Sequence, residues 1–216
     1  MSSISEDKLS LVRKLYYKDS MSMNELAKQL RVSLNSVVYF MRKHSLPRRS
    51  SSENEKIKFA KKPISFALKT CNSNYDKNLK IAGVMLYWAE GYKSPEDQTI
   101  DLANSDPHMV TVFLNFLRRI CGVEDGRLRV QLYCYSNQNV KKLIDFWSEL
   151  IRIPKSQFTK PYVRKDYQNS KISKMKYGMV HIRYSDKKLW LVIMGWMKKY
   201  IEKLSVGTQA VNEGSL

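Results

Sequence analysis

The chain has few cysteines and no long apolar segment. Its three cysteines, Cys71, Cys121 and Cys134, are odd in number and lack the spacing of a metal site, so we expect reduced, buried thiols in a cytoplasmic protein. The longest apolar run near the end, residues 189–197, is too short to span a bilayer. The first residues show no charged region followed by an apolar stretch, so we expect no signal peptide. These absences argue against a membrane partner.

Common catalytic patterns are missing as well. The sequence has no Cys/His zinc pattern, no Gly-rich phosphate loop and no Ser/His/Asp signature. His44 and His108 have no metal-ligating neighbours at a useful spacing. His181 stands among basic residues, where contact with phosphate or water is expected rather than with a metal. The sequence therefore predicts no cofactor for its main activity.

Acidic residues are scarce relative to basic ones. The 216 residues include 38 Lys and Arg against 20 Asp and Glu, a formal net charge of +18. Such an excess attracts polyanions by releasing their counterions, whatever the fold. A solvated surface or an anionic membrane would also accept this charge, but a membrane needs an apolar anchor. The composition thus predicts a nucleic-acid-binding protein.

Residues 22–44 have the pattern of a helix-turn-helix. Ser22 and Glu25 form a capping-box signature at the start of one helix, and Ser33 can cap the next. Val37 and Met41 lie four residues apart on the buried side of that second helix. In a helix-turn-helix the second helix enters the DNA major groove.

The outer face of this second helix carries polar and basic residues, which an ordinary helical hairpin would not require. We predict that Ser33, Asn35, Ser36, Tyr39, Arg42 and Lys43 contact DNA.

A helix over residues 5–18 is expected to cover the hairpin and complete a domain of residues 1–46. Residues 47–75 have the Ser- and Lys-rich composition of a basic linker. At its start, Arg48 and Arg49 could contact phosphates or a minor groove, or belong to a plain solvated linker.

Residues 76–204 alternate helical and strand patterns and predict a second domain. Helices are expected at 79–91, 107–121, 140–151 and 187–204, and strands at 98–104, 127–135, 158–165 and 179–184. This order predicts an α+β fold with a mostly antiparallel four-stranded sheet, covered on one face by helices. Residues 205–216 lack periodicity and are expected to form a disordered tail.

The strands present two different faces. Leu128, Val130, Leu132 and Cys134 alternate with polar residues in one strand, as do Val180, Ile182 and Tyr184 in another. A solvated antiparallel sheet also has one polar face, but such a face usually mixes charges, and Asp101 is the one acidic residue expected here. The residues predicted to contact nucleic acid on this face are Arg127, Arg129, Gln131, Tyr133, Tyr135, Lys160, Tyr162, Arg164, His181 and Arg183.

The helix before the first strand is almost wholly apolar and ends in Glu90 and Gly91. Followed by a basic-faced sheet, this helix resembles the motif of the LAGLIDADG homing endonucleases. The resemblance implies that Glu90 is the acidic residue that binds a divalent metal such as Mg²⁺ and acts in catalysis, and that Ala89 and Gly91 are the small residues around it. Because only one such helix is present, the resemblance implies a homodimer.

The combination with a helix-turn-helix is also similar in part to bacterial sporulation regulators, which bind DNA without cutting it. The sequence therefore predicts a sequence-specific double-stranded-DNA-binding protein that regulates transcription. The alternative is a Mg²⁺-dependent homing-type endonuclease. A third possibility is RNA binding, with tyrosines stacked on unpaired bases.

Overall fold

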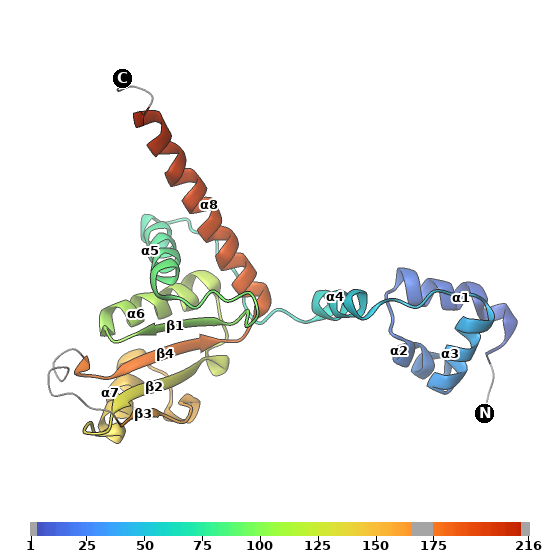
Figure 1. The fold of residues 1–216 in the computed structure, drawn as a ribbon, viewed down its shortest axis with the longest axis horizontal. Coiled ribbons are helices and arrows are strands. Elements are labelled where there is room, and N and C mark those ends of the chain that lie inside the picture. The colour runs from blue at the N-terminus through green and yellow to red at the C-terminus, as the bar shows by residue number, and fades with distance from the viewer. Residues whose placement is uncertain (1–3, 166–174, 213–216) are drawn as a thin grey trace. The chain divides into compact units, whose positions relative to one another are not determined.

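The computed structural model describes residues 4–165 and 175–212, with side chains described up to residue 205. The chain divides into two compact units, Met1–Pro63 and Ile64–Leu216. Figure 1 shows the elements of both units. Among the described residues, no helix combines the length and apolar character that crossing a membrane requires.

Unit 1 consists of helical elements. They are η1 (Glu6–Lys8), α1 (Leu9–Arg13), η2 (Lys14–Lys18), α2 (Met23–Leu30), α3 (Leu34–Lys43) and α4 (Ser51–Lys61). The first three follow one another without a break and occupy the span predicted as one helix. α2 and α3 cover the residues predicted as a helix-turn-helix.

Local side-chain hydrogen bonds determine where α2 and α3 begin. The Ser22 hydroxyl accepts from the Glu25 N–H at 3.1 Å, and the Glu25 carboxylate accepts from the Ser22 N–H, so the expected capping box is present. The Ser33 hydroxyl caps α3 by accepting from the Ser36 N–H at 3.1 Å. Arg31 ends α2 in the left-handed conformation, with φ of 55°. The two helices therefore meet at a short, defined turn.

A small apolar core joins the helices of unit 1. Phe40, which the sequence reading did not single out, is buried in it beside the expected Val37 and Met41. The buried residues are Val12, Leu15, Tyr16, Leu26, Ala27, Val37, Phe40, Met41 and Leu46.

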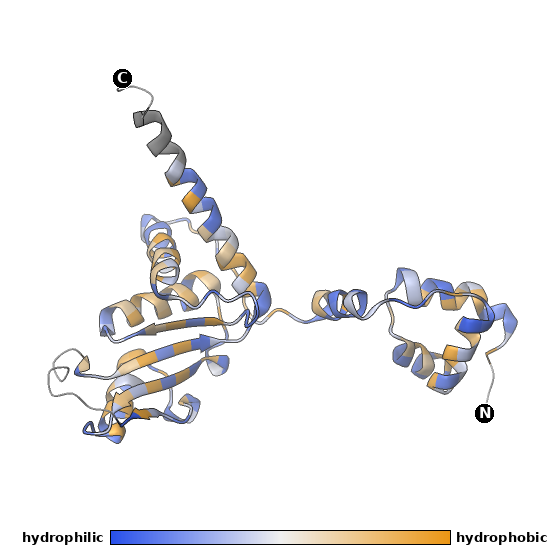
Figure 2. Ribbon diagram, viewed as in Figure 1, coloured by the Kyte–Doolittle hydropathy of each residue, from blue (hydrophilic) through white to orange (hydrophobic). Residues whose placement is uncertain are grey.

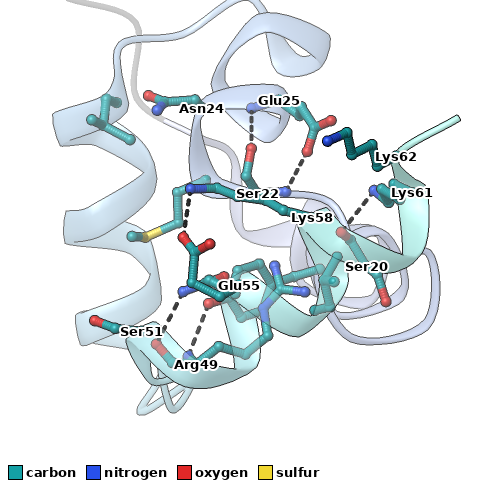
Figure 3. Close-up of a pocket in the computed structure, with 15 residues that line it drawn as sticks. Ser20, Ser22, Asn24, Glu25, Arg49, Ser51, Glu55, Lys58, Lys61 and Lys62 are labelled. Atoms are coloured by element: carbon teal, nitrogen blue, oxygen red, sulfur yellow. Dashed lines mark hydrogen bonds and ion pairs between the residues drawn. The ribbon is translucent and has the colours of Figure 1, made fainter. Parts of the chain in front are cut away.

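The prediction that residues 47–75 form a linker is wrong in its first part, because these residues include α4. Ser50 and Glu53 make a second capping box that starts this helix. The Lys61 ammonium donates to the Ser20 carbonyl at 2.9 Å and connects the end of α4 to the segment between η2 and α2. A hollow of about 830 Å³, bordered by residues of α2 and α4, is shown in Figure 3.

Unit 2 contains helices and a four-stranded sheet. Its elements are α5 (Asn74–Glu90), β1 (Ile100–Asn104), α6 (Pro107–Asn115), η3 (Phe116–Cys121), η4 (Asp125–Arg127), β2 (Arg129–Tyr135), α7 (Val140–Ile151), η5 (Lys155–Gln157), β3 (Tyr162–Arg164), β4 (Met179–Tyr184) and α8 (Lys187–Asn212). The expected tail is wrong over residues 205–212, because α8 continues to Asn212. Residues 213–216 lie outside the described residues.

The strand order in the sheet is β1-β4-β2-β3. β4 pairs antiparallel with both β1 and β2, whereas β2 and β3 run parallel. The fold is therefore α+β with a mixed sheet, in which two of the three strand pairs are antiparallel. The last strand in the sequence lies between the first and the second.

One face of the sheet joins the core of unit 2, as the alternating pattern predicted. Side chains of α5, α6, α7 and α8 share this core with the inward-facing strand residues. Figure 2 shows apolar and polar residues alternating along β2 and β4. The buried inward residues are Ile100, Leu102, Leu128, Val130, Leu132, Cys134, Val180, Ile182 and Tyr184. The opposite face is polar.

The segment that follows Pro63 belongs to unit 2, which corrects the predicted domain boundary at residue 76. The buried Ser65 hydroxyl donates to the Asp186 carboxylate at 2.5 Å, and the Tyr184 hydroxyl donates to the Ser65 carbonyl. The Ala67 N–H donates to the Gly122 carbonyl at 3.0 Å. These bonds fix the segment to the sheet and to the end of η3.

Candidate nucleic-acid interface

The outward side chains of the sheet form rows that cross the strands. The strand register gives the rows Asp101–Arg183–Arg129, Ala103–His181–Gln131, Met179–Tyr133–Tyr162 and Tyr135–Arg164. All of these residues are half-buried or exposed. Most of the predicted sheet contacts are thus brought together on one surface, which we call the outer sheet face.

Asp101 organises the end of this face that lies on β1 and β4. Its carboxylate accepts from Arg183 Nε at 2.7 Å and lies 2.9 Å from His181 Nδ1. Burial raises the pKa of Asp101, but the hydrogen bonds from His181 and Arg183 outweigh it, so this pKa lies below the ordinary aspartate value. Asp101 therefore stays ionised and holds two of the predicted contact residues in place.

Aromatic rings line up across the rest of the face. The Tyr133 ring lies between the other two, 4.9 Å from the ring of Tyr162 and 4.6 Å from that of His181, as measured between centroids. Tyr162, on the edge strand β3, is 53% exposed. The outer sheet face thus joins a charged end to an aromatic end.

Three of the residues predicted to contact nucleic acid on the sheet make hydrogen bonds that involve backbone carbonyls. Lys160 precedes β3, is exposed, and its carbonyl accepts from the Gln131 side chain at 3.2 Å, so it lies beside the face. The exposed Arg129 folds back to donate to the Gly126 carbonyl at 2.8 Å. Arg127 lies in η4, donates to the Ser185 carbonyl, and places its guanidinium 5.5 Å from the Tyr184 ring. Because Tyr184 faces inward, Arg127 lies at the margin and not among the rows.

α3 presents the polar face that the sequence predicted. Tyr39 is 69% exposed, and Asn35 and Arg42 are exposed as well. Ser33 and Ser36 are hydrogen-bonded to each other at the start of the helix, with 2.9 Å between their hydroxyl oxygens. Ser33, Asn35, Ser36 and Tyr39 border an open hollow of about 640 Å³.

Charges near α3 are partly paired within unit 1. Lys43 forms an ion pair with Glu6, which raises the pKa of Lys43. Arg49 stacks its guanidinium 4.1 Å from the Tyr16 ring centroid and donates to the Met21 carbonyl. Arg48 remains exposed. Of the two arginines expected to reach phosphates, Arg49 is therefore engaged in packing.

Glu90 lies exposed at the last residue of α5. The neighbouring Lys93, an obvious candidate for an ion pair, instead donates to the carbonyls of Trp88 and Gly91 at the end of the helix. Within the described residues, no cluster of three or more His, Cys, Asp or Glu side chains could hold a metal ion. A metal site at Glu90 would therefore need oxygen ligands from a second chain or from DNA.

Two features of the site were not foreseen from the sequence. Asp101 was recognised only as an acidic exception, whereas it pairs with His181 and Arg183. Met179 occupies an outward position beside Tyr133. A period-two pattern shows which face of the sheet a residue occupies but not which residues of other strands lie beside it. The pairing of Asp101 with His181 and Arg183 therefore had no signal in the sequence.

No protein-family model, curated protein or solved structure was found to match this chain. The resemblance to LAGLIDADG homing endonucleases therefore remains a prediction that depends on the residues alone.

Proposed function

We propose that the protein binds double-stranded DNA in a sequence-specific manner and regulates transcription. The observation that carries the proposal is the outer sheet face, where basic, amide and tyrosine side chains gather opposite the face that joins the core. Arg and Lys side chains suit phosphate oxygens, and Arg and Gln also suit base edges in the major groove. The net charge of +18 supplies the general attraction to a polyanion.

In this proposal the exposed side of α3 is a second surface that contacts DNA bases. Asn35, Tyr39 and Arg42 reach solvent on a helix that is anchored by its buried side. Side chains at such positions can contact base edges when the helix lies in the major groove. The polar outer face and the buried Val37, Phe40 and Met41 together support a helix-turn-helix.

A second copy of the chain is the protein partner that we propose. α5 exposes Ile81 and Trp88, which are 43% and 46% exposed and lie on the same side of the helix as the half-buried Met85. Exposed apolar side chains at this spacing form a stripe that another helix can cover. A homodimer through α5 would bury this stripe.

A Mg²⁺-dependent endonuclease is the second candidate function, and the position of Glu90 favours it. Glu90 is exposed at the last residue of α5 and lies about 200° around the helix from Trp88, so in this candidate its carboxylate would bind the metal together with phosphate oxygens of the bound DNA and not across the stripe. Carboxylates and DNA phosphate oxygens are the ligands that Mg²⁺ prefers. Binding without cleavage would need no metal.

Selection from a randomised duplex library, with and without Mg²⁺, tests both candidates. We expect a preferred sequence, and Arg42→Ala should weaken binding to it by about 1–3 kcal/mol if Arg42 contacts a base. The control is Arg13→Ala, which removes an exposed charge from α1 and should leave the preference intact. Equal binding by the parent and Arg42→Ala would remove α3 from the proposal.

The same assay separates regulator from nuclease. For a regulator, the parent and Glu90→Gln should both bind the selected duplex, and neither should cut it with Mg²⁺ or Mn²⁺. Because an amide is a poor ligand for a hard cation, cleavage by the parent that disappears in Glu90→Gln would establish the nuclease instead.

A further inference from the structure

A hollow of about 430 Å³ lies at the aromatic end of the outer sheet face. It is lined by Tyr133, Cys134 and Tyr135 of β2, by Tyr162 and Arg164 of β3, and by Met175 and Met179. β2 and β3 lie side by side at the edge of the sheet (Figure 1). The volume is near the small end of the range of about 300–1,000 Å³ for ligand pockets, so the hollow suits a single flat ring system.

The chemistry of the lining suits a planar aromatic ligand attached to an anion. Tyr133 is supported by the rings of Tyr162 and His181 on either side, at 4.9 and 4.6 Å between centroids. Tyr162 leaves about half of its surface exposed, so its ring can take a stacking partner. Arg164 also lines the hollow, and an arginine side chain suits a phosphate.

A fully paired double helix does not fit this lining well. Inside a duplex the faces of each base are covered by the neighbouring base pairs, and only base edges and the backbone are offered to a protein. Tyrosine rings stack on base faces, which become available in single strands, in bulges or when a nucleotide is turned out of the helix.

We propose that this hollow holds one unpaired nucleobase, stacked on Tyr162, within the nucleic acid bound by the outer sheet face. The inference rests on the proposed binding of nucleic acid by that face and specifies its ligand further. An unpaired base can be supplied by DNA or by RNA.

The test compares full-length protein on four labelled probes: a paired duplex and the same duplex with a single-nucleotide bulge, each as DNA and as RNA. We expect tighter binding of a bulged probe than of its paired counterpart, and the backbone that shows the difference identifies the source. Tyr162→Ala should remove most of that difference, a loss of roughly 5- to 100-fold, as deletion of one stacking ring predicts. 2-Aminopurine at the bulge should change fluorescence on binding to the parent and not to Tyr162→Ala.

Two variants control for folding and for general loss of a surface tyrosine. Tyr162→Phe keeps the ring and should keep the preference for the bulge. Tyr75→Ala removes a tyrosine of similar exposure, 58%, at the start of α5, and should also keep the preference.

The outcomes separate this inference from the function on which it rests. The probes carry the duplex sequence selected above, so if none of them binds, both the proposed function and the inference are wrong. Equal binding of paired and bulged probes, unchanged in Tyr162→Ala, would overturn the inference and leave duplex binding in place.

Discussion

At the scale of single residues, Asp101 fixes two side chains of the outer sheet face. It is a carboxylate on a surface proposed to bind a polyanion, yet its two oxygens hold His181 and Arg183. Its side chain is only 14% exposed. In the proposed complex the negative charge of Asp101 opposes phosphate binding, while its hydrogen bonds fix the positions of two neighbouring side chains.

We expect Asp101→Asn to lower stability by roughly 1–3 kcal/mol at pH 7, because two partners lose a charged acceptor. The pKa of Asp101 is lowered in the folded state. Its contribution is therefore complete above the ordinary aspartate pKa of about 4 and is lost as the pH falls through the folded pKa. Urea unfolding of parent and variant should differ at pH 7 and converge in acid. A difference that persists in acid would contradict this account.

The same variant should bind DNA more tightly and with a steeper salt dependence, by about one unit of slope, because Arg183 becomes available to a phosphate. Asp97→Asn is the matched control, since it removes an exposed negative charge that no ion pair in the described residues uses. An equal slope in both variants would mean that Arg183 does not reach a phosphate.

At the scale of elements, Gly83 lets α5 approach η3 closely. A Cβ atom at Gly83 would lie 2.1 Å from Cγ of the buried Phe116, a distance that no side chain tolerates. In the structure this glycine faces the core of its own chain, whereas Ile81 and Trp88 face outward.

Gly83→Ala should therefore destabilise unit 2 by about 1–3 kcal/mol, the usual cost of forcing extra atoms into a packed core. Gly195→Ala provides the comparison, because Gly195 lies within α8 and a Cβ atom there would meet nothing within 4 Å apart from the adjacent residues and backbone of its own helix. Relief of the low helix propensity of glycine should stabilise that variant by up to about 1 kcal/mol. Thermal unfolding of the two variants should shift in opposite directions. Shifts in the same direction would show that the Phe116 side chain can move to accommodate the added methyl group at little energetic cost.

Elements with a strong periodic pattern were predictable from the sequence, and elements without one were not. α7 and β4 begin and end where expected, because alternating or i, i+4 apolar residues mark them. The Ser- and Lys-rich composition predicts a linker where α4 lies, because the apolar residues of α4 do not form a clear stripe, although Ser50 and Glu53 carry a capping-box signature. The parallel pairing of β2 and β3 depends on long-range packing, which a local pattern does not encode.

The candidate site shows the same division. The alternation within each strand predicted that Gln131, Tyr133 and Arg183 lie on the polar face of the sheet. It did not predict the ion pairs of Asp101 or the ring contacts of Tyr133, because both depend on the strand order. The solvent-facing side of α3 was predictable because the Ser33 cap and the buried Val37 determine which side of that helix is exposed.

At the scale of the whole molecule, the boundary between the units lies at Pro63. Residues 64–216 should therefore fold as a separate chain. A shorter chain of residues 76–216, starting at the boundary that the sequence suggests, lacks Ser65 and leaves the buried Asp186 without its hydroxyl partner. We expect the shorter chain to unfold at a temperature lower by roughly 3–10 °C.

Ser65→Ala within residues 64–216 should account for part of that difference, and circular dichroism can follow all three chains. Equal unfolding temperatures of the two fragments would show that the segment from residue 64 only rests on the surface of unit 2.

The position of β4 in the sheet has a consequence for synthesis on the ribosome. β4 joins β1 to the β2–β3 pair, yet it is the last of the four strands to be translated. Until residue 184 has left the exit tunnel, β1 and β2 expose unpaired edges and unit 2 cannot close its core. Unit 1 is complete after 63 residues, so it can fold while the nascent chain of unit 2 remains a target for chaperones.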